Sequence, residues 1–179
     1  MTAVAYQGAE GAFSHEACRR FLPDQRAIAF ATFADVVDAV SRGDANLGML
    51  PLVNNQAGET GARSLIEQSD LRIVGEPVLP VRMHLLGLPS ASLEEVRTVV
   101  SHPVALKQCW RALSELGVSV EEAPNTAVAA KELVSGERAV LASETAAELY
   151  GLKILKRDVH DRTDNATTFA IIAREGEVQ

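Results

Sequence analysis

Short apolar runs alternate with stretches of helical periodicity along nearly the whole chain, and this alternation constrains the fold more than any single motif. Turn-favouring residues such as Gly, Pro, Asn and Ser follow many of the apolar runs. Strands are predicted at 3–6, 27–31, 47–50, 73–80, 82–88, 96–100, 118–120, 138–142, 153–159 and 169–173. Helices are predicted at 14–22, 33–43, 60–69, 103–117, 126–134 and 144–150. Thr32 and Ser143 are the predicted N-caps of two of them, and Gly43 is predicted to close the helix that follows Thr32. The alternation indicates an α/β fold with largely parallel sheets.

Two prolines, Pro77 and Pro80, interrupt an extended segment midway along the chain. Because proline cannot donate to a strand ladder, such a segment is typical of a hinge or crossover between lobes. The alternation of strands and helices then starts again. We therefore expect two lobes, each a mixed, mostly parallel sheet with flanking helices. The first comprises residues 1–79 and 160–179, and the second comprises residues 80–159.

Composition and charge exclude several classes of partner. The formal net charge is −7, whereas nucleic acids and anionic membranes are bound through basic patches, so neither is an expected partner. The N-terminus lacks a charged region followed by a long apolar region, and no apolar run approaches the roughly 20 residues of a membrane span. A soluble, cytoplasmic protein is expected.

Cysteines and histidines give no sign of a metal site. Cys18 and Cys109 each fall inside a predicted amphipathic helix, without the spacing of a metal site, and are expected to be reduced, buried thiols. The histidines are scattered along the sequence: His15, His84, His102 and His160. No metal is therefore predicted.

Four polar turns follow predicted strands, at 8–11, 54–56, 101–102 and 125–126. In open α/β sheets, ligands bind outside the carboxyl ends of the strands, and helix N-termini there carry partial positive charge. Turns of this kind facing one cleft are suited to a carboxylate-bearing ligand, with residues 165–168 as the floor between the lobes. Taken one at a time, the same turns are also consistent with ordinary capped turns or a surface loop.

Several segments resemble prephenate dehydratases, in order and over nearly the whole chain. They are Ala5-Tyr6-Gln7-Gly8-Ala9-Glu10-Gly11-Ala12-Phe13-Ser14, Ser101-His102-Pro103-Val104-Ala105-Leu106-Lys107-Gln108-Cys109, Asn125-Thr126-Ala127-Val128-Ala129-Ala130, Ala146-Ala147-Glu148-Leu149-Tyr150-Gly151-Leu152 and Asp164-Asn165-Ala166-Thr167-Thr168-Phe169. The resemblance implies two lobes like those of type 2 periplasmic binding proteins, an active site between them and a homodimer.

The resemblance also implies an activity. Prephenate, a small dicarboxylate, would lose its ring carboxylate as carbon dioxide and its C4 hydroxyl as water, giving phenylpyruvate without a cofactor. Hydroxide is a poor leaving group, so a proton donor is required, and the family's catalytic threonine falls on Thr167. The substrate-binding residues implied by the same motifs are Asn54, Asn55, Ser101, His102, Asn125, Thr126, Asn165, Thr168 and Phe169.

The chain departs from the family motifs at two places. The family's Thr-Arg-Phe is Thr167-Thr168-Phe169 here, and its Pro-Ile-Glu-Asn-Ser is Pro51-Leu52-Val53-Asn54-Asn55. A cation and an acid are lost together, which suggests a correlated change. The residues considered as replacements for the cation are Arg63, Arg82 and Lys107. Family members often continue into a phenylalanine-binding ACT domain, and none is expected after residue 179.

Two alternatives stay open beside the dehydratase. A non-aromatising prephenate decarboxylase would keep the C4 hydroxyl, and the altered Thr167-Thr168-Phe169 motif favours it. A non-catalytic module that closes on a small carboxylate would use the same two lobes.

Overall fold

The computed structural model describes residues 2–176 and divides them into two compact units. Unit 1 contains residues 2–9, 13–80 and 165–176, and unit 2 contains residues 10–12 and 81–164. The chain leaves unit 1 after Pro80 and returns at Asn165. It also gives residues 10–12 to unit 2, which the sequence pattern did not indicate.

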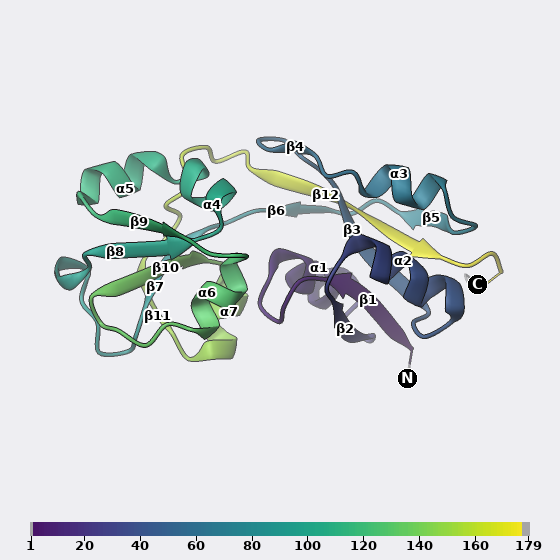
Figure 1. Ribbon diagram of the computed structural model, residues 1–179, viewed down its shortest axis with the longest axis horizontal. Helices are drawn as coiled ribbons and strands as arrows, with labels where there is room; N and C mark the ends of the chain where they lie inside the picture. The colour runs from purple at the N-terminus through teal and green to yellow at the C-terminus, as the bar shows by residue number, and fades with distance from the viewer. Residues whose placement is uncertain (1, 177–179) are drawn as a thin grey trace. The chain divides into compact units, whose positions relative to one another are not determined.

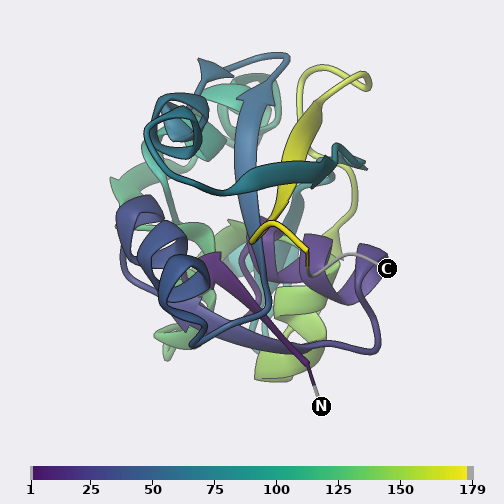
Figure 2. The same cartoon turned by 90° about the vertical axis from the view of Figure 1, so that its right-hand side faces the viewer.

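Unit 1 is built on a seven-stranded mixed sheet with the main order β2-β1-β3-β12-β5. The first three of these strands are parallel, whereas β12 runs antiparallel to both β3 and β5. Two short strands extend the sheet, because β4 pairs with β3 and β6 pairs with β12 (Figures 1 and 2). The strands are β1 Ala3–Gln7, β2 Arg26–Phe30, β3 Leu47–Asn54, β4 Gly58–Glu59, β5 Arg72–Gly75, β6 Val78–Pro80 and β12 Ala166–Ala173.

Helices cover both faces of this sheet: α1 (Phe13–Phe21), α2 (Phe33–Arg42) and α3 (Ala62–Glu67). On one face, α2 and α3 pack on apolar residues of the strands; this core includes Val36, Val40, Leu50, Leu52, Ile66 and Ile172. On the other face, α1 packs on a second set; this core includes Val4, Tyr6, Cys18, Met49, Leu79 and Phe169. Burial of two apolar layers against one sheet is what stabilises the unit.

The α2 helix shows how local sequence fixes the ends of an element. Thr32 accepts a hydrogen bond from the Asp35 amide, and the Asp35 carboxylate accepts from the Thr32 amide, which forms a capping box. Gly43 ends the helix in the left-handed conformation at φ +83°, where a residue without Cβ is favoured. Both ends were predicted from the sequence and are confirmed.

Unit 2 contains a five-stranded sheet of order β11-β7-β10-β8-β9. The β10, β8 and β9 strands are parallel, and β7 and β11 are antiparallel to their neighbours. The strands are β7 His84–Gly87, β8 Thr98–Ser101, β9 Ser119–Glu122, β10 Arg138–Ala142 and β11 Lys153–Lys156. The helices are the 3-10 turn η1 Leu93–Glu95 and α4 Pro103–Gln108, α5 Trp110–Leu116, α6 Thr126–Lys131 and α7 Glu144–Tyr150. The predicted mixed α/β class is confirmed in both units.

The single helix predicted over 103–117 is wrong, because the chain breaks at Cys109 into α4 and α5. The loop at Asp161 explains the break. Its amide donates to the Gln108 carbonyl over 2.7 Å, and its carboxylate accepts from the Arg111 amide over 3.0 Å. Backbone groups that would have continued one helix are therefore satisfied by a segment some 50 positions away, which the helical pattern cannot indicate.

The third strand is also longer than predicted. It continues through Pro51 to Asn54, so residues expected in a polar turn belong to the strand, and the chain then folds back into β4, not directly into a helix. Thr60 fixes the next turn, because its hydroxyl bonds to the Pro51 carbonyl over 2.5 Å and accepts from the Ala62 amide. The helix consequently starts two residues later than predicted.

Both cysteines are buried as free thiols. Burial raises the pKa of Cys18 and of Cys109 to about 12, so neither is a thiolate near neutral pH. Among the residues that the structure describes, no helix combines the length and apolar character that a membrane crossing requires.

A close approach in unit 1 gives a stability prediction. A Cβ on Gly48 would lie 2.7 Å from Ile172 Cγ1 and 3.1 Å from Val40 Cγ2. We expect Gly48→Ala to lower the free energy of unfolding by about 1–3 kcal/mol, because the core must move apart. Gly136→Ala is the matched control, since a Cβ there meets open space. Urea unfolding measures both variants, and equal losses in the two would contradict the packing argument.

A buried histidine in unit 2 gives a pH prediction. The His84 Nδ1 accepts a hydrogen bond from the Asp158 amide over 3.0 Å, which requires neutral imidazole. Burial lowers the pKa of His84 from 6.5, although the carboxylates of Asp158 and Glu144 oppose the shift. The unfolded chain therefore binds more protons, and the free energy of unfolding should fall as pH drops from about 7 to about 5. The His84→Gln variant should show a flatter dependence in urea titrations across this window, and parallel slopes would refute the assignment.

Candidate functional site

Thr167 lies near the start of β12, where the strand is paired on both sides. Asn54 of β3 is its ladder partner on one side, and Leu79 of β6 is its partner on the other. The Thr167 side chain is mostly enclosed, with 8% of its surface exposed. The backbone of Thr167 is therefore held by both neighbouring strands, and its side chain has limited contact with water.

The carboxamide of Asn54 joins three parts of unit 1. Its Nδ2 lies 2.9 Å from Thr167 Oγ1, 2.9 Å from Asn165 Oδ1 and 3.2 Å from the Ala166 carbonyl oxygen. Its Oδ1 accepts from the backbone amides of Gln56 and Ala57, each over 2.9 Å. One side chain therefore closes the β3–β4 turn and holds the first residues of β12.

The neighbouring carboxamide of Asn55 continues this attachment. The Asn55 amide donates to the Ala166 carbonyl over 3.1 Å, and the Ala166 amide donates to Asn55 Oδ1 over 2.9 Å. Gln56 Nε2 also reaches Asn55 Oδ1 at 3.4 Å. The three consecutive carboxamides that suggested a ligand turn thus make hydrogen bonds within unit 1.

Thr168 lies on the opposite face of the sheet from Thr167, because successive residues of a strand alternate between faces. Its ladder partner on β3 is Val53, and Val53 is paired in turn with Glu59 of β4. Val53 packs against the core beneath α2 and α3. The two positions that depart from the family motifs, 53 and 168, are therefore cross-strand neighbours.

Phe169 and Asn165 are both buried. Phe169 is 1% exposed and packs in the α1-side core with Met49 and Leu79. Asn165 is 3% exposed and accepts from Asn54. The family motifs implied a substrate-binding role for both residues. In the structure, the Phe169 ring is part of the core of unit 1.

The candidate binding residues of unit 2 hold the ends of strands and helices. Ser101 is fully buried, and its hydroxyl donates to the Leu141 carbonyl over 2.8 Å. His102 and Asn125 are N-caps: His102 Nδ1 accepts from the Val104 amide and Asn125 Oδ1 accepts from the Val128 amide.

Thr126 follows Asn125 as the first residue of α6 and is buried. The substrate-binding roles of Ser101, His102, Asn125 and Thr126 stay predictions. The prediction that these turns and those of unit 1 face one cleft also stays a prediction.

The glycine-rich turn after β1 makes contacts that its sequence did not suggest. The Gly11 carbonyl accepts from the Ser143 hydroxyl over 2.9 Å, and a Cβ on Gly11 would lie 3.2 Å from Ala146. Ser143 caps α7, as predicted, by accepting from the Ala146 amide. Residues 10–12 are thereby attached to α7 within unit 2.

Arg63, Arg82 and Lys107, the three residues considered as replacements for the family arginine, contact residues other than the predicted site residues. Arg63 lies 3.6 Å from a Glu76 carboxylate oxygen within unit 1. In unit 2, Arg82 forms a two-pronged contact with Asp158 at 2.8 and 2.5 Å, and these hydrogen bonds hold the pKa of the Asp158 carboxyl below its usual value. Lys107 lines an apolar hollow of about 340 Å³ beside Trp110.

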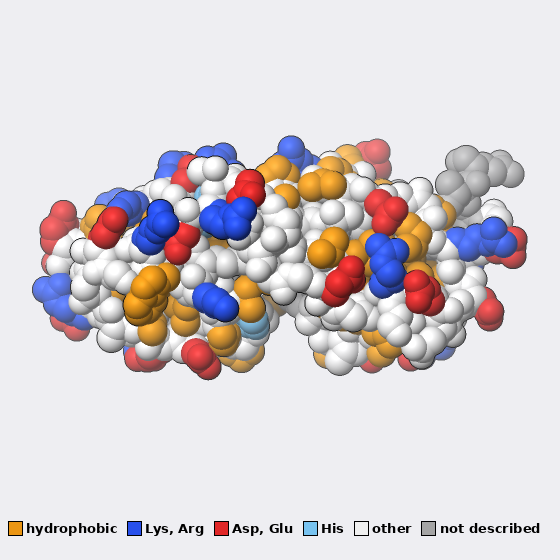
Figure 3. All heavy atoms as spheres, turned by 90° about the horizontal axis from the view of Figure 1, so that it is seen from above, with side chains coloured by type: hydrophobic (Ala, Val, Ile, Leu, Met, Phe, Trp, Pro, Cys, Tyr) orange, Lys and Arg blue, Asp and Glu red, His pale blue; other side chains and the backbone are white. Residues whose placement is uncertain are grey.

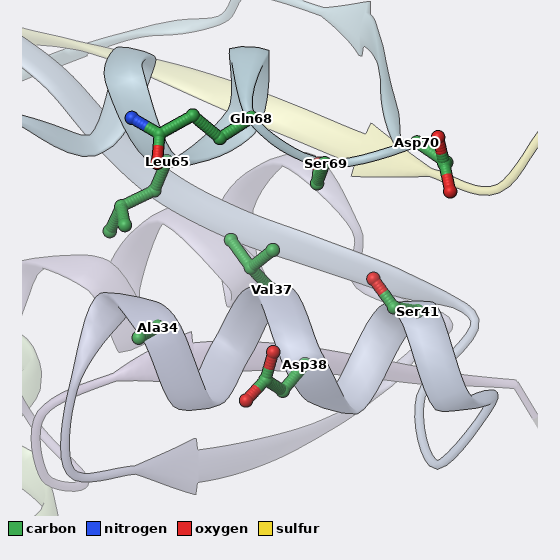
Figure 4. Close-up of a pocket in the computed structure, with 8 residues that line it drawn as sticks. All are labelled: Ala34, Val37, Asp38, Ser41, Leu65, Gln68, Ser69 and Asp70. Carbon is green, nitrogen blue, oxygen red and sulfur yellow. The ribbon is translucent and has the colours of Figure 1, made fainter.

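A second hollow, also of about 340 Å³, lies between α2 and α3 (Figure 4). Val37 and Leu65 form its apolar part, and Asp38, Ser41 and Asp70 lie at its polar edge. None of the predicted site residues lines it. Within residues 2–176, no group of three or more His, Cys, Asp or Glu residues could hold a metal ion. Figure 3 shows acidic and basic side chains interspersed on the face that it draws.

Asn54 and Thr167 were both predicted from the sequence as site residues, but the hydrogen bond between them was not predicted. They are separated by 113 positions, and no local pattern encodes the register between two such strands. The local sequence could not reveal the role of Asn54. Three consecutive carboxamides are typical both of a ligand-binding turn and of a hairpin whose side chains bond to its own backbone.

Comparison with known proteins places the chain in a family. The prephenate dehydratase family model matches residues 4–177. The chain is 39% identical over 176 residues to an Arabidopsis thaliana arogenate dehydratase/prephenate dehydratase, covering 96% of this chain and 46% of that protein. It is 39% identical over 175 residues to a bifunctional N-acyl-homoserine lactone acylase/prephenate dehydratase of Komagataeibacter europaeus, covering 96% and 62%. The chain thus spans about half of the length of the first relative and less than two thirds of the length of the second.

Solved structures agree on the fold. A protein described as a novel type of quorum quenching acylase superposes with a TM-score of 0.90 at 38% identity, over 97% of this chain and 64% of that one. The prephenate dehydratase of Arthrobacter aurescens superposes with a TM-score of 0.90 at 23% identity, over 98% and 61%. A lipoprotein of Treponema pallidum, Tp32, reaches 0.51 at 13% identity over 98% and 84%. The latter two matches concern the fold alone.

Proposed function

The chain belongs to the prephenate dehydratase family, and we propose that it catalyses the decarboxylating dehydration of prephenate to phenylpyruvate in phenylalanine biosynthesis. The observation that carries the proposal is the enclosed Thr167 hydroxyl, held by Asn54 at the position of the family's catalytic threonine. The chain is identical at 39% of aligned positions to a relative that carries this activity in its name.

The proposed reaction requires a proton donor from the protein. The bond between the ring and its carboxylate breaks, and its electron pair enters the ring as the C4–oxygen bond breaks. The departing oxygen takes up a proton and leaves as water, so that prephenate and one proton give phenylpyruvate, carbon dioxide and water. We assign Thr167 as the donor to the departing oxygen. Formation of the aromatic ring supplies much of the driving force, so a weakly acidic hydroxyl in a preorganised site is sufficient.

Arogenate is a second candidate substrate. The relatives with 35–39% identity include plant proteins named for arogenate alone and for both substrates. Arogenate carries an ammonium group where prephenate carries a ketone. The leaving groups and the role of Thr167 are the same for both substrates.

A product assay tests the proposed function. Purified protein is incubated with prephenate or arogenate near neutral pH, and ultraviolet absorbance and mass spectrometry detect phenylpyruvate or phenylalanine above the spontaneous background. An aromatic product from either substrate supports the proposal and identifies the substrate. Carbon dioxide without an aromatic product would contradict the dehydratase proposal and indicate a non-aromatising decarboxylase. A ligand-induced rise in Tm without turnover would indicate a binding module.

The Thr167→Val variant keeps the shape of the side chain and removes the hydroxyl. We expect kcat to fall by about 10²–10⁴-fold, because the departing oxygen loses its donor. Thr168→Val is the matched control, since the same change is made one residue away on the opposite face of the sheet, and its kcat should be close to that of the wild type. Steady-state kinetics with circular dichroism as the folding check measure both. A near-normal kcat in Thr167→Val would remove Thr167 from the mechanism.

We further propose that positions 53 and 168 act as a ladder pair and not as substrate contacts. Val53 and Thr168 are cross-strand partners, so an acid and a base at these positions would face each other. Exchange of both for neutral residues removes an ion pair without leaving an unpaired charge. The correlated departure from the family motifs is then compatible with retained activity.

A double-mutant cycle tests this pairing. Val53→Glu and Thr168→Arg should each lower the free energy of unfolding, and the double variant should recover about 0.2–1 kcal/mol relative to the sum of the two. Thr168→Arg alone should leave KM unchanged. A strictly additive cycle, or a lower KM in the single variant, would instead place residue 168 in contact with substrate.

A further inference from the structure

We propose that Asn54 is a positioning residue that orients the hydroxyl of Thr167, and not a ligand of the substrate. This inference rests on the proposed function, because it concerns the donor that the reaction uses. It assigns Asn54 a role different from the substrate contact that the family motif suggested.

The orientation of the carboxamide is fixed by its surroundings. The oxygen and nitrogen of an amide are distinguished by their partners, and here one end meets two backbone N–H donors. The Gln56 and Ala57 amides both point at Oδ1 over 2.9 Å. A flipped amide would place NH₂ against two N–H groups, so Nδ2 must face Asn165 and Thr167.

Both ends of the Asn54 carboxamide form hydrogen bonds within unit 1. Nδ2 carries two hydrogens and lies within bonding distance of three acceptors: Asn165 Oδ1, Thr167 Oγ1 and the Ala166 carbonyl. Oδ1 has two lone pairs and accepts from two backbone amides. A substrate that bound this carboxamide would have to displace bonds that close the β3–β4 turn.

The consequence for Thr167 concerns its proton. A hydroxyl has one hydrogen to donate and two lone pairs that accept. Because Nδ2 can only donate, Thr167 Oγ1 must be the acceptor of the 2.9 Å bond. The Thr167 hydrogen therefore points away from Asn54 and is available to the departing oxygen of the substrate.

The ladder makes this arrangement rigid. Asn54 and Thr167 are directly paired residues of β3 and β12, so their side chains share a face and their backbones are fixed relative to each other. Threonine is β-branched and has few χ1 rotamers, which limits the positions of the hydroxyl further. Preorganisation of this kind reduces the reorganisation needed when charge develops on the departing oxygen.

The Asn54→Asp variant reverses the hydrogen bond. A carboxylate only accepts, so the Thr167 hydroxyl turns to donate to it and is lost to the substrate. Near neutral pH we expect kcat to fall by about 10²-fold with KM unchanged. As pH falls and the introduced carboxyl takes up a proton it becomes a donor, so kcat should recover relative to the wild type at the same pH. A merely structural role would give no such recovery.

Asn46→Asp is the matched control, because Asn46 Oδ1 accepts from the Ala3 amide over 3.0 Å and an aspartate retains that bond. Its kcat and pH profile should follow the wild type. Asn54→Ala should lower kcat without recovery at acid pH. An Asn54→Asp variant with raised KM and unchanged kcat would overturn the proposal and make Asn54 a substrate ligand. A wild type inactive on both prephenate and arogenate would instead refute the proposed function, before any variant is compared.

The wild type supplies a measurement that does not depend on the folding of variants. The Asn54 side-chain amide protons, observed by NMR, should be protected from exchange in the ligand-free protein and remain equally protected when phenylpyruvate is added to saturation. Amide protons that exchange freely and become protected only with phenylpyruvate would overturn the positioning role.

Discussion

The pairing of β12 with β3 is the interaction on which unit 1 and its candidate site depend. It brings the last strand of the chain antiparallel to a strand more than a hundred positions earlier and places Thr167 opposite Asn54. The same ladder carries β5 and β6 on its far side, so the sheet is completed only when β12 is in place. Because the donor candidate lies on that strand, Thr167 is placed beside Asn54 only when this ladder is formed.

Local sequence predicted those elements whose ends are set by their own residues. The β10 strand, the Thr32 and Ser143 caps and the left-handed Gly43 follow from side-chain chemistry within one turn of the chain. Prediction was wrong where distant residues decide. Asp161 divides the helix at Cys109, and β12 extends β3 through a stretch that the sequence pattern assigned to a turn. Tertiary hydrogen bonds override propensity at both places.

The same distinction applies to the site. Sequence motifs identified Thr167 and Asn54, because residue type and neighbours carried a family resemblance. Their mutual bond and the burial of Phe169 depend on strand register, and a shift of one residue would send every side chain of β12 to the other face. Residue identity was thus available from the sequence, but which residues touch each other was not. For Asn54 that contact changes the inferred role from ligand to support.

Register also explains why two departures from the family motifs occur together. The replaced acid and base fall on opposite strands at one level of the ladder, on the face of the sheet that packs beneath α2 and α3. A lone charge there would sit beside Val53 or Thr168 without its partner, at the edge of an apolar core, and would cost desolvation without a compensating attraction. Loss of one member therefore favours loss of the other. Because Thr167 faces the other side of the sheet, its hydroxyl and the carboxamide that orients it are unaffected by this exchange, and the chemistry proposed for Thr167 does not require the missing cation.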